Sequence, residues 1–167
     1  MSIHSRLCYI ENSNVNRPAD GEAALRSLLA KVRTEYPVKS IELGVMNHLA
    51  ANLKGQNRLK EYEIMGNECV IAARASGQSA KKDLIVALTH LARAQYMLGK
   101  NDLAERHQRE SVVNSLAIPA DLPLAIRSLS RLESWIREWG RTTEADKLKE
   151  EIDSLVERDT ADKEGVY

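Results

Sequence analysis

Histidine and cysteine are the residue types in this chain that could hold a metal ion or supply a nucleophile. The 167-residue sequence contains four histidines and two cysteines. No histidine has the spacing to another histidine, cysteine or carboxylate that zinc or di-iron motifs require. Cys8 and Cys69 lie far apart, and no CxxC pair occurs. We therefore expect no metal site and no cofactor.

Motifs for nucleophilic catalysis and for phosphate binding are also missing. The sequence has no GxSxG, no GxxxxGK[ST] and no GxGxxG. Its carboxylates alternate with lysines at helical spacing, as in Lys147 with Glu151 and Lys149 with Asp153. Pairs at this spacing are typical of a solvated helix face. The sequence predicts that the protein is not an enzyme.

Charge and hydropathy exclude two further classes of binding. Lys and Arg total 24 and Asp and Glu total 24, so the net charge is zero. Nucleic acids and anionic membranes are bound through a basic excess, which argues against both partners. No apolar run approaches the roughly 20 residues of a membrane span, and residues 1–18 lack the apolar core of a secretory signal. With two isolated thiols, these features predict a cytoplasmic protein.

The elements that position the remaining residues are predicted to be helices. Apolar residues recur at helical spacing from residue 20 to about residue 158. We expect an all-α fold of about seven helices in stacked antiparallel hairpins. The expected helices span residues 20–36, 38–54, 57–76, 79–98, 101–117, 122–139 and 142–158. The expected organisation is an N-terminal extension (1–18), a helical repeat domain (19–159) and a disordered C-terminal tail (160–167).

Three junctions between expected helices share one pattern. A glycine follows the helix end, a polar residue comes next, and Asn or Thr then opens the following helix. The junctions are Lys54-Gly55-Gln56-Asn57, Leu98-Gly99-Lys100-Asn101 and Trp139-Gly140-Arg141-Thr142. Apolar residues repeat around them, and Leu53, Leu98 and Trp139 are 45 and 41 residues apart. Periods of 20–50 residues indicate stacked helical pairs.

The second of these hairpins resembles a tetratricopeptide repeat. Leu91-Ala92, Tyr96, Gly99 and Ala104 match the order of residues in that family. The resemblance extends over roughly residues 38–158, with a period longer than the family's usual one. It implies a right-handed superhelix whose concave face, built from the first helix of each pair, binds a peptide or partner protein. The alternative is an unrelated helical bundle.

The resemblance also gives a set of candidate binding residues on the first helices of the pairs. Three of them are arginines, and a guanidinium binds a carboxylate in a two-pronged geometry. A partner segment with an acidic side chain or a free C-terminus is therefore the preferred ligand, and a solvated face paired with glutamates is the alternative. The candidates are His48, Asn52, Thr89, Arg93, Tyr96, Arg127, Ser130, Ser134 and Arg137.

The fifth expected helix is polar all round and offers an alternative function. His107, Gln108 and Ser111 occupy the positions that should face inward. Either they line a pocket of a ligand- or peptide-sensing regulator, or the helix is an exposed outer layer, which we prefer because buried polar groups need partners. Self-association through the last helix is a third alternative.

Trp135 and Trp139, four residues apart, are expected to be buried.

Overall fold

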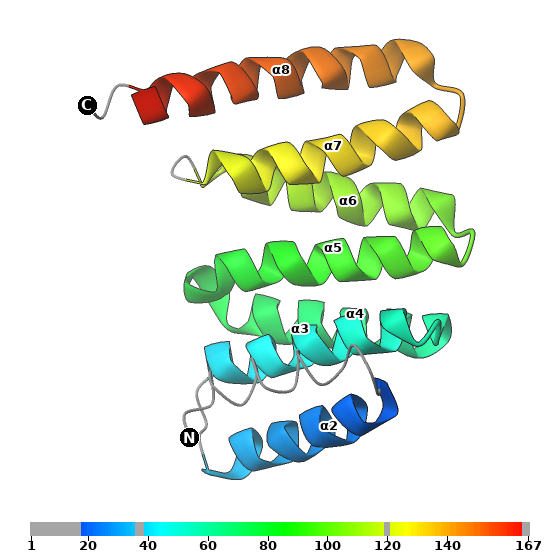
Figure 1. The fold of residues 1–167 in the computed structure, drawn as a ribbon, viewed down its shortest axis with the longest axis vertical. Helices are drawn as coiled ribbons and strands as arrows, with labels where there is room; N and C mark the ends of the chain where they lie inside the picture. Colours follow the sequence, from blue (N-terminus) through cyan, green and yellow to red (C-terminus); the bar gives the residue numbers. More distant parts are fainter. Residues whose placement is uncertain (1–17, 36–38, 119–120, 165–167) are drawn as a thin grey trace. The chain divides into compact units, whose positions relative to one another are not determined.

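The described residues form helices joined by short turns. The computed structural model describes residues 18–35, 39–118 and 121–164, and no strand occurs among them. The all-α prediction is thereby confirmed (Figure 1). The elements are α2 (Pro18–Glu35), α3 (Lys39–Gly55), α4 (Leu59–Ala75), the short 3-10 helix η1 (Gly77–Ala80), α5 (Lys81–Met97), α6 (Asn101–Leu116), α7 (Leu122–Glu138) and α8 (Thr142–Glu164).

Two helix ends differ from the sequence expectation. The fourth expected helix was placed from Ser79, but that residue lies within η1 and its hydroxyl donates to the Ser76 carbonyl oxygen at 3.0 Å. α5 therefore begins only at Lys81. α8 continues to Glu164, into the range expected to be a tail. Residues 1–17 of the expected N-terminal extension lie outside the described residues.

The chain divides into two compact units, residues 1–104 and 105–167, and the division falls within α6. In the first unit, α4 packs against both α3 and α5, and α3 also contacts α5. α2 packs against α3. Each helix thus covers the apolar stripe of its neighbours, as in stacked hairpins, where one pair alone could not bury its core.

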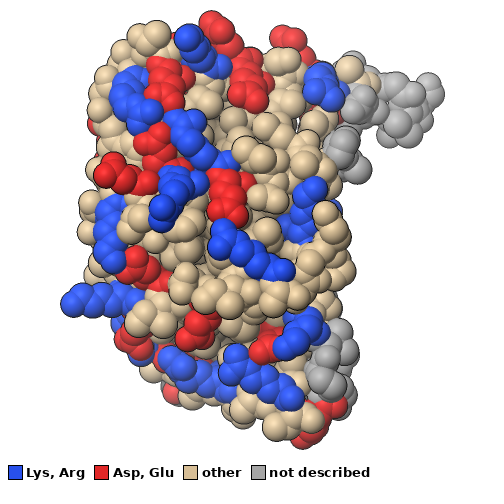
Figure 2. All heavy atoms as spheres, turned by 180° about the vertical axis from the view of Figure 1, so that it is seen from behind, with Lys and Arg blue, Asp and Glu red and all other residues tan. Residues whose placement is uncertain are grey.

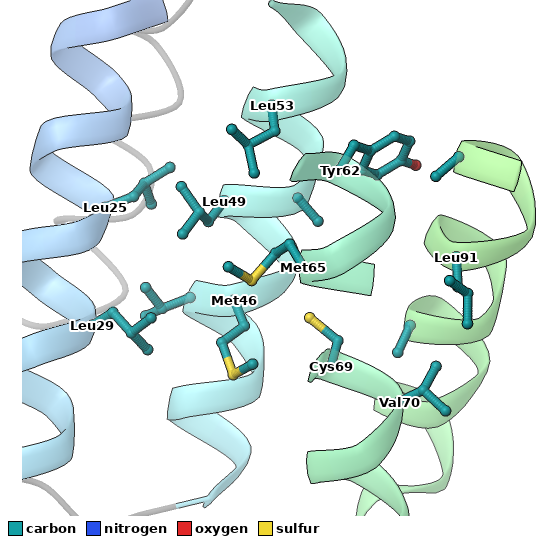
Figure 3. Packing of buried hydrophobic residues seen from close by; sticks show 14 of the residues in the cluster. Leu25, Leu29, Met46, Leu49, Leu53, Tyr62, Met65, Cys69, Val70 and Leu91 are labelled. Carbon is teal, nitrogen blue, oxygen red and sulfur yellow. The ribbon is translucent and has the colours of Figure 1, made fainter. Parts of the chain in front are cut away.

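The core of the first unit is an aliphatic layer between these helices. Leu25 of α2 lies opposite Leu49 of α3, and Met65 of α4 points towards the same layer (Figure 3). Leu91 of α5 lies beyond Val70 of α4 and belongs to the same core. Full burial of such a side chain stabilises the fold by about 1.5–3 kcal/mol relative to exposure, so the packing holds the helices in one arrangement.

The core of the second unit forms between α7 and α8. Leu132 and Ile136 of α7 are buried with Ile152 and Leu155 of α8. The burial predicted for the two tryptophans holds for Trp135, which is 6% exposed. Trp139 is half-buried and packs against the edge of the same cluster.

Two of the three junctions adopt the predicted glycine turn. Gly99 and Gly140 have φ angles of +74° and +79°. Lys100 N–H donates to the Gln95 carbonyl oxygen at 2.9 Å, and Arg141 N–H to that of Ile136 at 3.1 Å. These bonds, from a residue to the fifth one before it, define the Schellman turn that ends a helix.

The first junction corrects the sequence assignment. Gly55 is the last residue of α3, and the left-handed residue is Asn57, with φ +58°. Arg58 N–H donates to the Leu53 carbonyl oxygen at 3.1 Å, which makes the same turn two residues later than predicted. Asn tolerates the left-handed conformation because its short polar side chain bonds locally.

This correction changes the repeat register. Asn57, Gly99 and Gly140 are 42 and 41 residues apart, so the period is nearly constant and the expected spacing of 45 is wrong. The same register aligns three leucines that are all buried: Leu49, Leu91 and Leu132. It also moves the candidate positions on α3. The residues equivalent to Thr89, Arg93 and Tyr96 of α5 are Asn47, Ala51 and Lys54.

Candidate interaction surface

The residue that follows each turn is a cation, and each pairs with a carboxylate on an earlier helix. Arg58 bonds Glu22 of α2, Lys100 Nζ lies 2.6 Å from a Glu63 oxygen of α4, and an Arg141 nitrogen lies 2.6 Å from a Glu105 oxygen of α6. The partners are 36, 37 and 36 residues apart in the sequence. We call these three contacts the turn ion pairs. They recur with the repeat, so these cations serve the fold.

Two carboxylates of the turn ion pairs, Glu22 and Glu105, have lowered pKa values. Burial of Glu105 opposes ionisation, but hydrogen bonds from Arg141 and Arg109 outweigh it and hold its pKa below the ordinary value. Burial likewise opposes ionisation of Glu22, whose pKa is lowered by hydrogen bonds from Arg26 and Gln56 and by the charge of Arg58. In Figure 2, cations and carboxylates are interspersed over the surface, in keeping with this pairing.

Arg93 differs from these paired arginines. It is half-buried on α5, and it makes no ion pair or hydrogen bond with any described residue. Thr89 and Tyr96 lie four residues before it and three after it, on the same side of the helix, and both are half-buried with contacts of their own. Arg93 is therefore a guanidinium whose hydrogen-bond donors the described part of the protein leaves unused.

The two candidates on α3, His48 and Asn52, already interact with other residues of the protein. His48 is half-buried and already has a partner. Asn52 is only 7% exposed, and its Nδ2 donates to the Pro18 carbonyl oxygen at 3.0 Å. Its Oδ1 accepts from Gln56 Nε2 at 2.6 Å. Asn52 thus joins α3 to the first residue of α2, a role that explains the polar side chain in an otherwise apolar layer.

The four candidates of the second unit lie on α7. Arg127, Ser130 and Ser134 are exposed. Arg137 Nε donates to a Glu133 oxygen at 2.7 Å, and its NH2 to an Asp146 oxygen at 2.9 Å. These bonds, chiefly that to Glu133, raise the pKa of Arg137. Arg127 makes no ion pair with the described residues, so it is the α7 arginine left open to a partner.

The polar residues of α6 are buried, which corrects the preferred reading of an exposed layer. Gln108 and Ser111 are both 0% exposed, and His107 is half-buried. Gln108 Nε2 donates to the Ser128 carbonyl oxygen of α7 at 2.8 Å, and the Ser111 and Ser128 hydroxyls are 3.5 Å apart. Polar partners on α7 make this burial tolerable. Gln108 and Ser111 thus take part in the packing of α6 against α7, while the Gln108 Oε1 atom is buried without a hydrogen-bond partner among the described residues.

A pocket that the sequence analysis did not predict lies between α4 and α5. It has a volume of about 390 Å³ and lies within the first unit. Its lining mixes carboxylates, amides and aliphatic side chains: Glu63, Ile64, Asn67, Glu68, Leu91 and Gln95. One sequence signal was available, since Gly66 in the middle of α4 marks a close helix contact. A Cβ there would lie 3.0 Å from the Leu91 Cα.

Metal binding, thiol chemistry and membrane insertion find no support in the described residues. No group of three or more His, Cys, Asp or Glu among them is placed to hold a metal ion. Burial raises the pKa of the Cys69 thiol to about 12, so it stays protonated. Of the helices described, none is both long and apolar enough to cross a bilayer.

The comparisons with known proteins include a likeness to a solved structure. No family model and no curated protein matches the chain. It is similar to the crystal structure of a putative kinesin light chain from Podosopora anserina with nearly identical TPR-like repeats, at 14% identity and a TM-score of 0.45. The match covers 95% of this chain and 96% of that chain.

Proposed function

We propose that the protein is a non-catalytic interaction module that binds a partner protein through an acidic segment, either a carboxylate side chain or a free C-terminus. The observation that carries the proposal is Arg93, a half-buried guanidinium without an ion pair among the described residues. A half-buried site strengthens a charged hydrogen bond relative to one in open solvent. A bidentate bond to a carboxylate would use the donors that Arg93 leaves free.

The surroundings of Arg93 support a surface made by two helices. α3 and α5 contact each other, and the corrected register places Asn47, Ala51 and Lys54 of α3 at the positions of Thr89, Arg93 and Tyr96 of α5. Ala51 is small and exposed, which leaves space next to the arginine position. Lys54 adds a second cation, and Tyr96 adds an aromatic ring suited to packing against a partner side chain. The packed helices act as a rigid scaffold, which lowers the entropic cost of docking.

The second unit offers an equivalent position. Arg127 of α7 is exposed and unpaired with the described residues, and Ser130 and Ser134 on the same helix add hydroxyl donors. Arg137 has two carboxylate partners already, so a ligand at that position would have to displace them. We therefore expect Arg93 and Arg127 to contribute more to binding than Arg137.

Selection from a displayed library of random 12-residue peptides with free C-termini tests the proposal. The wild-type protein should enrich peptides that carry Asp, Glu or a required terminal carboxylate. The Arg93→Glu variant should lose them. Arg106→Glu is the matched control, because Arg106 is an exposed arginine on α6 without an ion pair among the described residues. Equal enrichment by wild type and Arg93→Glu would overturn the assignment of Arg93, and a lack of any enrichment would contradict the function.

A further inference from the structure

The pocket between α4 and α5 combines two chemistries. Glu63, Glu68, Asn67 and Gln95 provide polar groups, while Ile64 and Leu91 provide an apolar floor. Its volume of about 390 Å³ is at the lower end of the range of ligand pockets and has room for protruding side chains of a partner. We call this pocket the α4–α5 groove.

An exposed aliphatic stripe on α4 extends the apolar part of the groove. Ile64 and Ile71 are 58% and 59% exposed, the highest values among the large hydrophobic residues of the first unit. They are seven residues apart, which puts them on one face of α4, two turns from each other. Ile64 lines the pocket and Ile71 lies on the same face of α4 beyond it, and exposed apolar surface of this kind is typical of a docking surface.

The carboxylates of the groove define the charge of its occupant. Lys100, from the turn after α5, places its ammonium 2.6 Å from a Glu63 oxygen. This contact shows that the rim of the groove accepts a lysine side chain. Glu68, on the other hand, makes no ion pair with the described residues, so one acidic position remains available to an incoming cation.

The groove is fixed by close helix packing. Gly66 lets α4 approach the backbone of α5 so closely that a Cβ would lie 3.0 Å from the Leu91 Cα. The residues of α4 that line the groove, Glu63, Ile64, Asn67 and Glu68, flank this contact on both sides of Gly66 in the sequence. Arg93 lies two residues from both Leu91 and Gln95, about 200° around the helix, so the groove is distinct from the proposed Arg93 surface.

From the charge and the apolar stripe, we propose that the α4–α5 groove is a second docking surface, which binds a cationic amphipathic segment of a partner protein. An aliphatic side chain of that segment enters between Ile64 and Leu91, and a lysine or arginine pairs with Glu68. This proposal does not depend on Arg93, and the two surfaces select partners of opposite charge.

Fluorescence anisotropy with a model peptide tests the proposal. The probe is a labelled 14-residue helix of Leu and Lys with leucines on one face, and a Leu/Glu helix of the same pattern is its counterpart. The wild-type protein should bind the Leu/Lys helix and not the Leu/Glu helix. Ile71→Asp and Glu68→Lys should each weaken binding about tenfold or more, the loss expected for a central contact.

The repeat supplies a matched control. Val113 of α6 occupies the position of Ile71 in the next hairpin and is 67% exposed, but it lies outside the two helices that line the groove. Val113→Asp should leave the affinity unchanged. If Val113→Asp and Ile71→Asp weaken binding equally, the peptide binds apolar surface in general and the proposal is overturned.

A variant that should bind more tightly tests whether the Leu/Lys helix binds at the groove or is attracted only by the net charge of the protein. Lys100→Gln frees Glu63 and should strengthen binding of the Leu/Lys helix about two- to fivefold, the range for an exposed ion pair. Lys147→Gln of α8 changes the net charge equally and should have no effect. An equal gain in both variants would contradict the proposal.

A second copy of the chain is the competing occupant. Light scattering at two concentrations should show a monomer for wild type and for Ile71→Asp. A dimer that Ile71→Asp dissociates would assign the groove to self-association and would overturn the proposal. The proposal would also be overturned if Arg93→Glu no longer bound the Leu/Lys helix, because Arg93 lies on a different side of α5 from the groove. Circular dichroism of each variant confirms that it is folded.

Discussion

Of the three arginines that the sequence offers as binding residues, Arg137 has carboxylate partners within the protein, whereas Arg93 and Arg127 make no ion pair with the described residues. Arg58, Arg137 and Arg141 each bond two carboxylates. Arg93 is half-buried and has none among the described residues. The residue types alone did not separate these cases, because the pairing of an arginine depends on residues some 36 positions away in the sequence.

Arg93→Glu should therefore weaken partner binding and leave the fold intact. No ion pair or hydrogen bond among the described residues is lost, so we expect the free energy of unfolding to change by less than about 0.5 kcal/mol. Thermal unfolding followed by circular dichroism measures this. A collapse of thermal stability would show that Arg93 is structural and that the binding surface is misassigned.

Gly66 gives a prediction about packing. Gly66→Ala places a Cβ 3.0 Å from the Leu91 Cα, so α4 and α5 must move apart. We expect a loss of about 1–3 kcal/mol in the free energy of unfolding, the usual cost of overpacking, measured by urea denaturation.

Gly44→Ala is the matched control, since nothing lies within 4 Å of the added Cβ. It should stabilise the protein by up to about 1 kcal/mol through helix propensity. Equal effects of the two substitutions would mean that the α4–α5 contact is looser than described.

At the scale of the elements, the helices follow from hydrophobic periodicity, and their limits agree with the structure to within a few residues at most ends. The position of the turn after α3 does not follow from periodicity, because glycine and asparagine both adopt the left-handed conformation and either Gly55 or Asn57 could end the helix. The backbone places it at Asn57. The sequence pattern favours the glycine, and the spacing of 45 residues expected from it differs from the observed 42 by three positions, so Arg93 aligns with Ala51 rather than with His48.

The two assignments of that turn predict opposite effects of substitution. Gly55→Ala should be neutral or slightly stabilising, because Gly55 ends a helix with nothing within 4 Å of a Cβ. Asn57→Ala should cost about 1 kcal/mol, since alanine is strained at φ +58°. Chemical denaturation of both variants compares them. Destabilisation by Gly55→Ala alone would restore the turn expected from the sequence.

Neither the burial of Gln108 nor the α4–α5 groove could be predicted from the sequence, and the reason is the same for both. Each depends on what a neighbouring helix presents: the Ser128 carbonyl to Gln108, and the Leu91 backbone to Gly66. A polar residue at an inward position is ambiguous until its partner is known. Periodicity gives the face of one helix but not the residue opposite it.

At the scale of the whole molecule, many charges of the described residues lie in ion pairs, among them the turn ion pairs. The carboxylates with lowered pKa values are Glu22, Glu42, Glu61, Glu105 and Glu144. Asp83 is the opposite case, since burial raises its pKa. The turn ion pairs thus make the fold dependent on ionised glutamates.

Stability should therefore fall in acid. A glutamate whose pKa is lower in the folded state than its ordinary 4.5 stabilises the fold above that value, and the contribution is lost as the pH falls below about 5 and through the folded pKa. Protonation of Asp83 has the opposite sign and offsets a part of this loss. Melting temperatures from pH 7 to pH 3 measure the effect. Arg141→Gln should reduce the pH dependence, and an unchanged profile would contradict the role assigned to Glu105 and Glu144.

The central claim is that the packed helices present Arg93 to an acidic partner segment. The most direct measurement is an NMR titration of the ¹⁵N-labelled protein with an acidic peptide from the library selection, followed at the Arg93 side-chain Nε–H. We predict that this signal shifts together with the amides of residues 89–96, and that the amide of Ile71 does not move. A peptide that binds while the Arg93 signal stays in place would contradict the account.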